Sequence, residues 1–195
     1  MAQLMNMPRM WSFGVALGLI VGGLTLVDKS RGQRSFVARS EPFTIAGVVA
    51  KPRHHELRAG TVAQLLNRRF TNVVIFDLRS AAEFAVSHLP RAVHVNAELT
   101  AEAFVAQYGG AMQDRVVVFY CTAGVHSGAF VAVVERELVM AGARSVHSLK
   151  DGVIGWANDG RWLHDAHGLT STVHPGHADL VPKLRTPMLA RFEAR

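Results

Sequence analysis

The sequence contains a single cysteine, Cys121, among its 195 residues. A lone cysteine excludes an intrachain disulfide and any zinc site that is built from several cysteines. The chain also lacks a long run of basic residues, although its formal net charge is +6. Because lysine and arginine are scattered and are not interleaved with aromatic residues, we do not expect the chain to bind nucleic acid.

Charged residues are scarce, at 18% of the chain, whereas 49% of the residues are hydrophobic. This composition supplies enough apolar side chains for one packed domain with extensions. Apolar runs and helical spacings alternate along the chain, with strands expected at 72–76, 92–95, 116–120 and 145–149 and helices at 61–69, 101–107 and 130–140. The alternation predicts an α/β domain with an open, mostly parallel sheet flanked by helices.

Cys121 lies where one of these apolar runs ends and a stretch of small residues begins. A free cysteine is usually a small buried core residue. In an open α/β sheet, however, ligands bind at the carboxyl ends of the strands, and the following helix N-terminus favours anions and thiolates. The order of strand, cysteine, short loop and helix therefore favours a nucleophile over a core residue.

Residues 11–27 form an apolar segment without a charged side chain. As a helix the segment would be roughly 26 Å long, at the short end for crossing a bilayer. No small-residue cleavage site follows it, so we expect an uncleaved single-pass anchor rather than a cleaved signal peptide. The basic residues after it favour a cytoplasmic soluble part. Gly14, Gly18 and Gly22 would share one helix face and allow a helix-mediated homodimer.

Two stretches, residues 73–95 and 116–156, resemble the single-domain rhodanese family. The residues that match the family motifs are Asp77, Arg79, Glu83, His88, Pro90, Ala92, Cys121, Gly124, Ser127, Gly152 and Trp156. The resemblance implies a rhodanese-like domain over 57–163, preceded by the anchor with its flanks (1–34) and a linker (35–56). Residues 164–195 form a C-terminal tail.

The resemblance implies that Cys121 is the catalytic residue of a sulfurtransferase and cycles between thiolate and persulfide. The residues expected to bind the substrate are Thr122, Ala123, Gly124, Val125 and His126. Asp77, Arg79, Glu83 and His88 would tie a turn and a helix to the sheet. The expected partners are a small sulfane-sulfur donor and a thiol or protein acceptor, with no cofactor and no metal.

The sequence departs from the family pattern at several positions. Ser87, Arg91 and Asp151 replace glycines, and His126 stands where many members have an arginine. An arginine would bind the sulfonate of thiosulfate with two hydrogen bonds, whereas a histidine is only partly charged near neutral pH. His126 can therefore be read either as a substrate contact or as a neutral loop residue, and thiosulfate is an uncertain donor.

Other enzyme classes fit the sequence less well. A cysteine-dependent phosphatase needs an arginine six residues after its cysteine, where this chain has Ser127. The nucleophile elbow of serine hydrolases is absent from "GVHSG". The alternative from another class is a rhodanese-like module that binds or tethers a partner at the membrane without turning over sulfur.

The C-terminal tail contains two His-x-x-His pairs, His164 with His167 and His174 with His177. Imidazole and nearby carboxylates are ligands for divalent metals. Because Pro175 and Gly176 interrupt the second pair, we expect a solvated, loosely ordered tail instead of a metal site.

Overall fold

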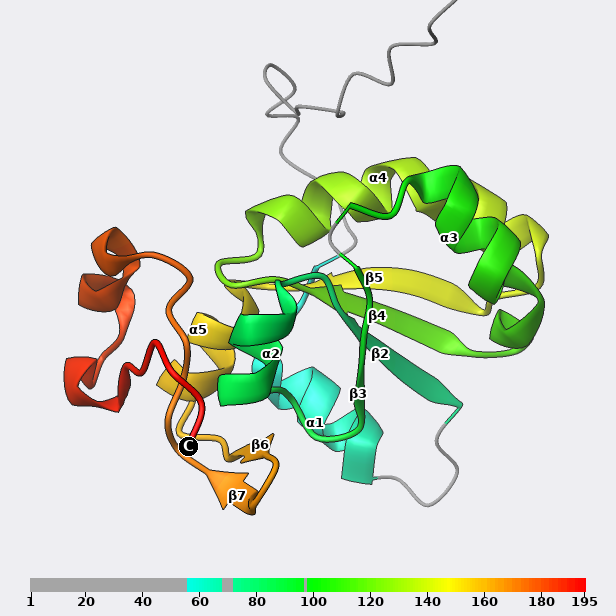
Figure 1. Ribbon diagram of the computed structural model, residues 1–195. Helices are drawn as coiled ribbons and strands as arrows, with labels where there is room; N and C mark the ends of the chain where they lie inside the picture. Colours follow the sequence, from blue (N-terminus) through cyan, green and yellow to red (C-terminus); the bar gives the residue numbers. More distant parts are fainter. Residues whose placement is uncertain (1–55, 68–71, 97) are drawn as a thin grey trace, which may run out of the picture. The chain divides into compact units, whose positions relative to one another are not determined.

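Five parallel strands form the central sheet of the computed structural model, which describes residues 56–67, 72–96 and 98–195 (Figure 1). The strands are β1 (Glu56–Leu57), β2 (Val73–Asp77), β3 (Ala92–His94), β4 (Val116–Tyr120) and β5 (Ser145–Leu149). Their order is β1-β5-β4-β2-β3, and every neighbouring pair is parallel. The expected α/β fold with a parallel sheet is therefore confirmed, and β4, the strand before Cys121, lies at its centre.

Helices cover both faces of the sheet (Figure 1). They are α1 (Ala59–Asn67), α2 (Ala81–Val86), α3 (Ala101–Tyr108), α4 (Val125–Met140) and α5 (Gly152–Asn158). The remaining elements are the hairpin β6 (Leu163–Asp165) and β7 (Gly168–Thr170) and the 3-10 turns η1 (Gly109–Met112), η2 (Ala178–Lys183) and η3 (Pro187–Leu189).

The alternation of side chains along β4 divides the core into two clusters. Val118 and Tyr120 are fully buried in the cluster that contains α1 and α5. Val117 and Phe119 are equally buried in the cluster that contains α3 and α4. A strand that is buried on both faces has a continuous apolar sequence, and this explains why the pattern of residues 116–120 predicts its bounds correctly.

The helix after Cys121 begins earlier than its apolar spacing predicts. We expected a helix from Phe130, but α4 begins at Val125, directly after Gly124. The first turns of α4 bury Ser127 and Gly128 where a helix usually buries large apolar side chains. The connection between β4 and α4 is therefore only Cys121 to Gly124, and His126 belongs to the first turn of the helix.

The C-terminal tail packs on the domain, so the expectation of a solvated, loosely ordered tail is wrong. Val173 and Leu184 are buried in the same cluster as α1 and α5, and His174 is only 8% exposed. A β-bridge between Val173 and Ala190 connects two parts of the tail that are distant in sequence. The apolar contacts explain its order, because each buried side chain contributes about 1.5–3 kcal/mol.

The predicted membrane anchor, residues 11–27, lies outside the residues that the structure describes. Within the described ranges, no helix has both the length and the apolar character needed to cross a membrane. The single-pass anchor, its cytoplasmic orientation and the helix-mediated homodimer stay predictions.

Candidate active site

Cys121 lies at the carboxyl end of the central strand, immediately before the first turn of α4. Its side chain is largely buried, with 6% of the residue exposed. The backbone N–H of Ser127 donates a hydrogen bond to the Cys121 Sγ at 3.5 Å. Free N–H groups and the positive end of the dipole at a helix N-terminus stabilise negative charge. The sulfur therefore lies within reach of a backbone N–H group at the start of this helix.

A cavity of about 430 Å³, here called the cysteine cavity, opens over the thiol. Its lining residues are Leu78, Arg79, Ser80, Glu83, Cys121, Thr122, Ala123, Val125 and His126. The structure thus brings together all the residues predicted for the site except Gly124, which is buried at the end of the loop and does not line the cavity. Arg79 and Glu83, which we expected to be structural, also line the cavity.

The start of α5 holds the loop that begins at Cys121 through hydrogen bonds. The backbone N–H groups of Val153 and Ile154 donate hydrogen bonds to the carbonyl oxygens of Cys121 and Thr122, at 3.0 and 3.2 Å. Gly152 makes this approach possible, because a Cβ there would lie 2.3 Å from the Cys121 carbonyl oxygen. Two carbonyl groups of the loop are thereby fixed, and the thiol is held in one position.

A buried network anchors the wall of the cavity to the sheet. The Arg79 guanidinium donates to both carboxylate oxygens of Asp77, with Nε to Oδ1 at 3.0 Å, and also to the Ser87 carbonyl at 2.7 Å. The Tyr120 hydroxyl donates to Asp77 and accepts from the Leu89 N–H at 3.1 Å. Burial opposes the charge on Arg79, but the electrostatic interactions with Tyr120 and the Asp77 carboxylate outweigh it and hold the Arg79 pKa above its usual value. These contacts confirm that Asp77 and Arg79 tie the turn after α2 to the sheet.

Glu83 connects α2 to the loop that follows Cys121. Ser80 and Glu83 form the predicted capping box at the start of α2, and Glu83 Oε1 accepts a hydrogen bond from the Thr122 hydroxyl at 2.9 Å. Burial would raise the pKa of Glu83, but the hydrogen bonds from Ser80 and Thr122 lower it below the ordinary value. The Glu83 carboxylate is therefore ionised at neutral pH and fixes the loop.

The tail contacts the same carboxylate, which the sequence did not indicate. His174 Nδ1 lies 3.9 Å from Glu83 Oε1 and accepts a hydrogen bond from the Gly176 N–H at 3.0 Å. A Cβ at Gly176 would be 3.1 Å from the Thr122 side chain. In the sequence, His174-Pro175-Gly176 indicated only an interrupted metal-binding motif and gave no sign of this contact. Within the described residues, no three His, Cys, Asp or Glu side chains are placed to hold a metal ion.

His126 does not replace the missing arginine as a fixed cation. Burial lowers its pKa below the ordinary value, so the imidazole is neutral at pH 7. Among the described residues that line the cysteine cavity, the one permanent cation is Arg79, which is paired with Asp77. The first turn of α4 is consequently the main positive element near the thiol, and the loop after Cys121 carries no guanidinium that could bind a dianion such as thiosulfate.

A family model and a curated relative each match part of this chain. The family model of the rhodanese-like domain matches residues 61–159. The tRNA uridine(34) hydroxylase of Buchnera aphidicola subsp. Schizaphis graminum (strain Sg) is 26% identical over 105 residues, which is 53% of this chain and 32% of that protein. The chain thus spans about a third of that relative's length.

Solved structures of similar fold include the thiosulfate sulfurtransferase from Pseudomonas aeruginosa. It is 20% identical, with a TM-score of 0.46, and the match covers 74% of this chain and 24% of that chain. A rhodanese-like domain protein from Staphylococcus aureus is 18% identical, with a TM-score of 0.41, over 60% of this chain and 96% of that one. Because the family model spans residues 61–159 in a chain of 195, half of the chain carries the match, and the protein belongs to the rhodanese-like domain family.

Proposed function

We propose that the protein is a rhodanese-type sulfurtransferase or persulfide carrier in which Cys121 accepts sulfane sulfur. The observation that carries the proposal is that the chain's single cysteine lines the cysteine cavity, with the Ser127 N–H donating to its sulfur. The helix N-terminus favours the anionic states that a sulfur carrier passes through.

The proposed transfer has two displacement steps and no net oxidation. In the first, the Cys121 thiolate attacks the outer sulfur of a donor. The sulfur–sulfur bond of the donor breaks, its electron pair leaves with the donor thiolate or sulfite, and a new sulfur–sulfur bond forms at Cys121. In the second, an acceptor thiolate attacks the outer sulfur and regenerates the Cys121 thiolate.

A sulfur-transfer assay on the full-length protein tests this proposal. We expect transfer to a thiol acceptor from at least one of thiosulfate, cysteine persulfide and glutathione persulfide, and no turnover above background with Cys121→Ser. Ser127→Ala is the matched control, because it keeps the backbone N–H that contacts the sulfur while removing a buried hydroxyl that donates to the Gly124 carbonyl. Absence of transfer from every donor would favour the second candidate, a module that binds a partner, which the lack of a loop arginine supports.

Replacing His126 by arginine is expected to strengthen thiosulfate binding about tenfold at pH 7.5, because guanidinium binds sulfonate oxygens with two hydrogen bonds. His126 has a lowered pKa, so its charge appears only as the pH falls below about 6.5, the ordinary value. The native protein should therefore gain affinity only under acidic conditions, whereas the arginine variant should not depend on pH in this range.

This prediction is checked by calorimetry in a Cys121→Ser background, where ionisation of the thiol does not contribute. Equal affinities with and without the arginine, at both pH 6 and pH 7.5, would show that position 126 does not contact the donor.

A further inference from the structure

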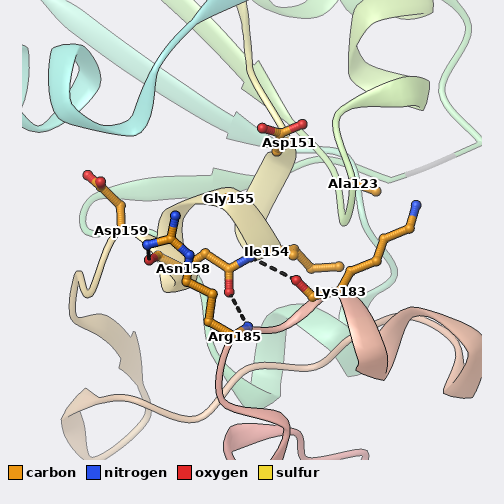
Figure 2. A pocket seen from close by; sticks show the side chains of 8 residues that line it. All are labelled: Ala123, Asp151, Ile154, Gly155, Asn158, Asp159, Lys183 and Arg185. Carbon is orange, nitrogen blue, oxygen red and sulfur yellow. Dashed lines mark hydrogen bonds between the residues drawn. The ribbon is translucent and has the colours of Figure 1, made fainter.

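A second cavity, of about 310 Å³, lies beside the loop that follows Cys121 (Figure 2). We call it the α5 cavity, because α5 and the residues on either side of it form most of its wall. Its lining residues are Ala123, Asp151, Ile154, Gly155, Asn158, Asp159, Lys183 and Arg185. Ala123 lines both this cavity and the cysteine cavity. Since Ala123 is two residues from Cys121, their Cα atoms are separated by at most about 7 Å.

The C-terminal tail builds one wall of the α5 cavity through Asn158. The Asn158 side-chain amide donates to the Lys183 carbonyl at 2.8 Å, and its oxygen accepts from the Arg185 N–H at 2.7 Å (Figure 2). The Arg185 guanidinium donates to the Asn158 carbonyl at 3.1 Å. The segment around Lys183 is therefore fixed against α5 on both sides of the buried Leu184.

Charged side chains of both signs line the α5 cavity. In the part of the chain that the structure describes, neither Asp151 nor Lys183 forms an ion pair, although both line the same cavity. Asp151 precedes α5 but makes no capping hydrogen bond. Asp159, by contrast, pairs with Arg161 at 2.6 Å. Figure 2 shows the Lys183 side chain extending toward the side where Ala123 lies.

We propose that the α5 cavity binds the α-amino acid group of a small persulfide, with Lys183 binding the carboxylate and Asp151 binding the ammonium group. Arg185 is a second cation of this cavity, and its guanidinium already donates to the Asn158 carbonyl. A site with unpaired charges of both signs fits a zwitterion better than it fits a simple anion. A volume near 300 Å³ is typical of the smaller ligand pockets. The inference rests on the proposed function and specifies its donor as a persulfide of cysteine or of a cysteine-containing peptide.

In this assignment one donor molecule occupies both cavities, with its amino acid group in the α5 cavity and its sulfur in the cysteine cavity. A tripeptide extends to about 10 Å, which is enough to pass Ala123 while its sulfur enters the cysteine cavity. The Cys121 thiolate then attacks the outer sulfur of R–S–SH. The sulfur–sulfur bond of the donor breaks with its electron pair on R–S, which takes up the persulfide proton and leaves as R–SH, while Cys121 retains the transferred sulfur as a persulfide anion.

Kinetics of the full-length protein with three donors test the assignment. We expect Lys183→Gln to lower the ratio of kcat/KM for glutathione persulfide to kcat/KM for thiosulfate about five- to tenfold, since thiosulfate carries no group for the α5 cavity. Asp151→Asn should lower the same ratio, and asparagine retains the left-handed conformation that Asp151 adopts, with φ of 58°. A loss confined to cysteine persulfide or to glutathione persulfide identifies which of the two is the donor, and a loss for both shows that the shared group is recognised.

Lys150→Gln is the matched control. Lys150 lines the neighbouring cavity beside Asp151 but does not line the α5 cavity, so the ratio should stay within about twofold of the native value. An unchanged ratio in both Lys183→Gln and Asp151→Asn would overturn the proposal. A parallel loss for all three donors would overturn it as well, because it would indicate a distorted loop.

Binding of S-methylglutathione, which cannot transfer sulfur, separates this inference from the proposed function. In the Cys121→Ser protein, the affinity for this probe should fall about five- to tenfold when Lys183→Gln is added. If no donor places sulfur on Cys121, the sulfurtransferase proposal fails. The α5 cavity assignment fails only if binding of the probe is absent or is insensitive to Lys183→Gln.

Discussion

Gly152→Ala is expected to lower kcat/KM for sulfur transfer about a hundredfold, although Gly152 does not line the cysteine cavity. The added Cβ would lie 2.3 Å from the Cys121 carbonyl oxygen and 2.6 Å from that of Thr122, whereas ordinary contacts begin at 3.4 Å. Both opposing atoms belong to the backbone, so the loop must move by about 1 Å, and a misplacement of that size costs about a hundredfold in rate.

Gly160→Ala is the matched control for this substitution. Gly160 also has a positive φ, +69° against +57° for Gly152, but no atom lies within 4 Å of its added Cβ. The control should lose about 1–2 kcal/mol of unfolding free energy from the left-handed backbone and keep its kcat/KM within about twofold. Equal activity of the two variants would show that α5 does not position the cysteine loop.

Asp77→Asn is expected to lower the free energy of unfolding by about 3–5 kcal/mol. Asp77 is fully buried, and its carboxylate is the partner of the Arg79 guanidinium and of the Tyr120 hydroxyl. The amide has nearly the same shape but no charge, so Arg79 would remain buried without its counter-ion. Among the described residues, the Arg79 Nη1 atom already lacks a hydrogen-bond partner. No other acceptor in this part of the chain therefore lies close enough to it to replace the Asp77 carboxylate.

The control is Asp114→Asn, which removes the charge from an exposed pair with Arg144 at 2.7 Å, where Asp114 is 59% exposed. Exposed pairs contribute about 0–1 kcal/mol, and asparagine tolerates the positive φ of 57° at this position. Urea unfolding at pH 7.5 measures both variants. A loss below about 1 kcal/mol in Asp77→Asn would mean that the buried pair does not hold the wall of the cysteine cavity.

Strands β2 and β4 were predictable from the sequence because each is a short, mostly continuous apolar run. Strands β3 and β5 were also expected, whereas no strand was expected at β1, β6 or β7. The expected bounds at 116–120 and 145–149 are those of β4 and β5, and the capping box of Ser80 and Glu83 is formed as its spacing indicated. Local patterns of this kind depend on a residue and its near neighbours in sequence, so they can be recognised before the fold is known.

The start of α4 and the support of the cysteine loop depend on packing between distant segments. Gly128 and Ser127 are buried because α4 begins close to the sheet, and small residues give no apolar periodicity to detect. The N–H groups of Val153 and Ile154 reach the loop only because β5 lies beside β4 in the sheet. A single sequence does not specify that pairing in advance.

Two departures from the family's glycine pattern have a clear structural meaning. Arg91 and Asp151 have φ of 63° and 58°, in the left-handed region that glycine adopts without strain. At Arg91 the φ therefore lies in the region that a glycine would favour. The substitution therefore changes the side chain while the local backbone keeps a glycine-like conformation.

The tail was misread because its signals are single residues in an apparently polar segment. Val173 and Leu184 have no periodic apolar neighbours, yet both are buried against the α1 and α5 face of the sheet. Lys183 and Arg185 would appear as isolated surface charges in the sequence. Only the fold shows that they line a cavity next to Ala123.

Intact-protein and peptide mass spectrometry after incubation with a persulfide donor tests the central claim most directly. The account predicts that the full-length protein gains the mass of one sulfur atom, that the added sulfur maps to the peptide containing Cys121, and that a thiol acceptor removes it. Because Cys121 is the only cysteine, the modified position is unambiguous. An unmodified Cys121 after treatment with thiosulfate, cysteine persulfide and glutathione persulfide would contradict the account and leave a rhodanese-like domain that does not carry sulfur.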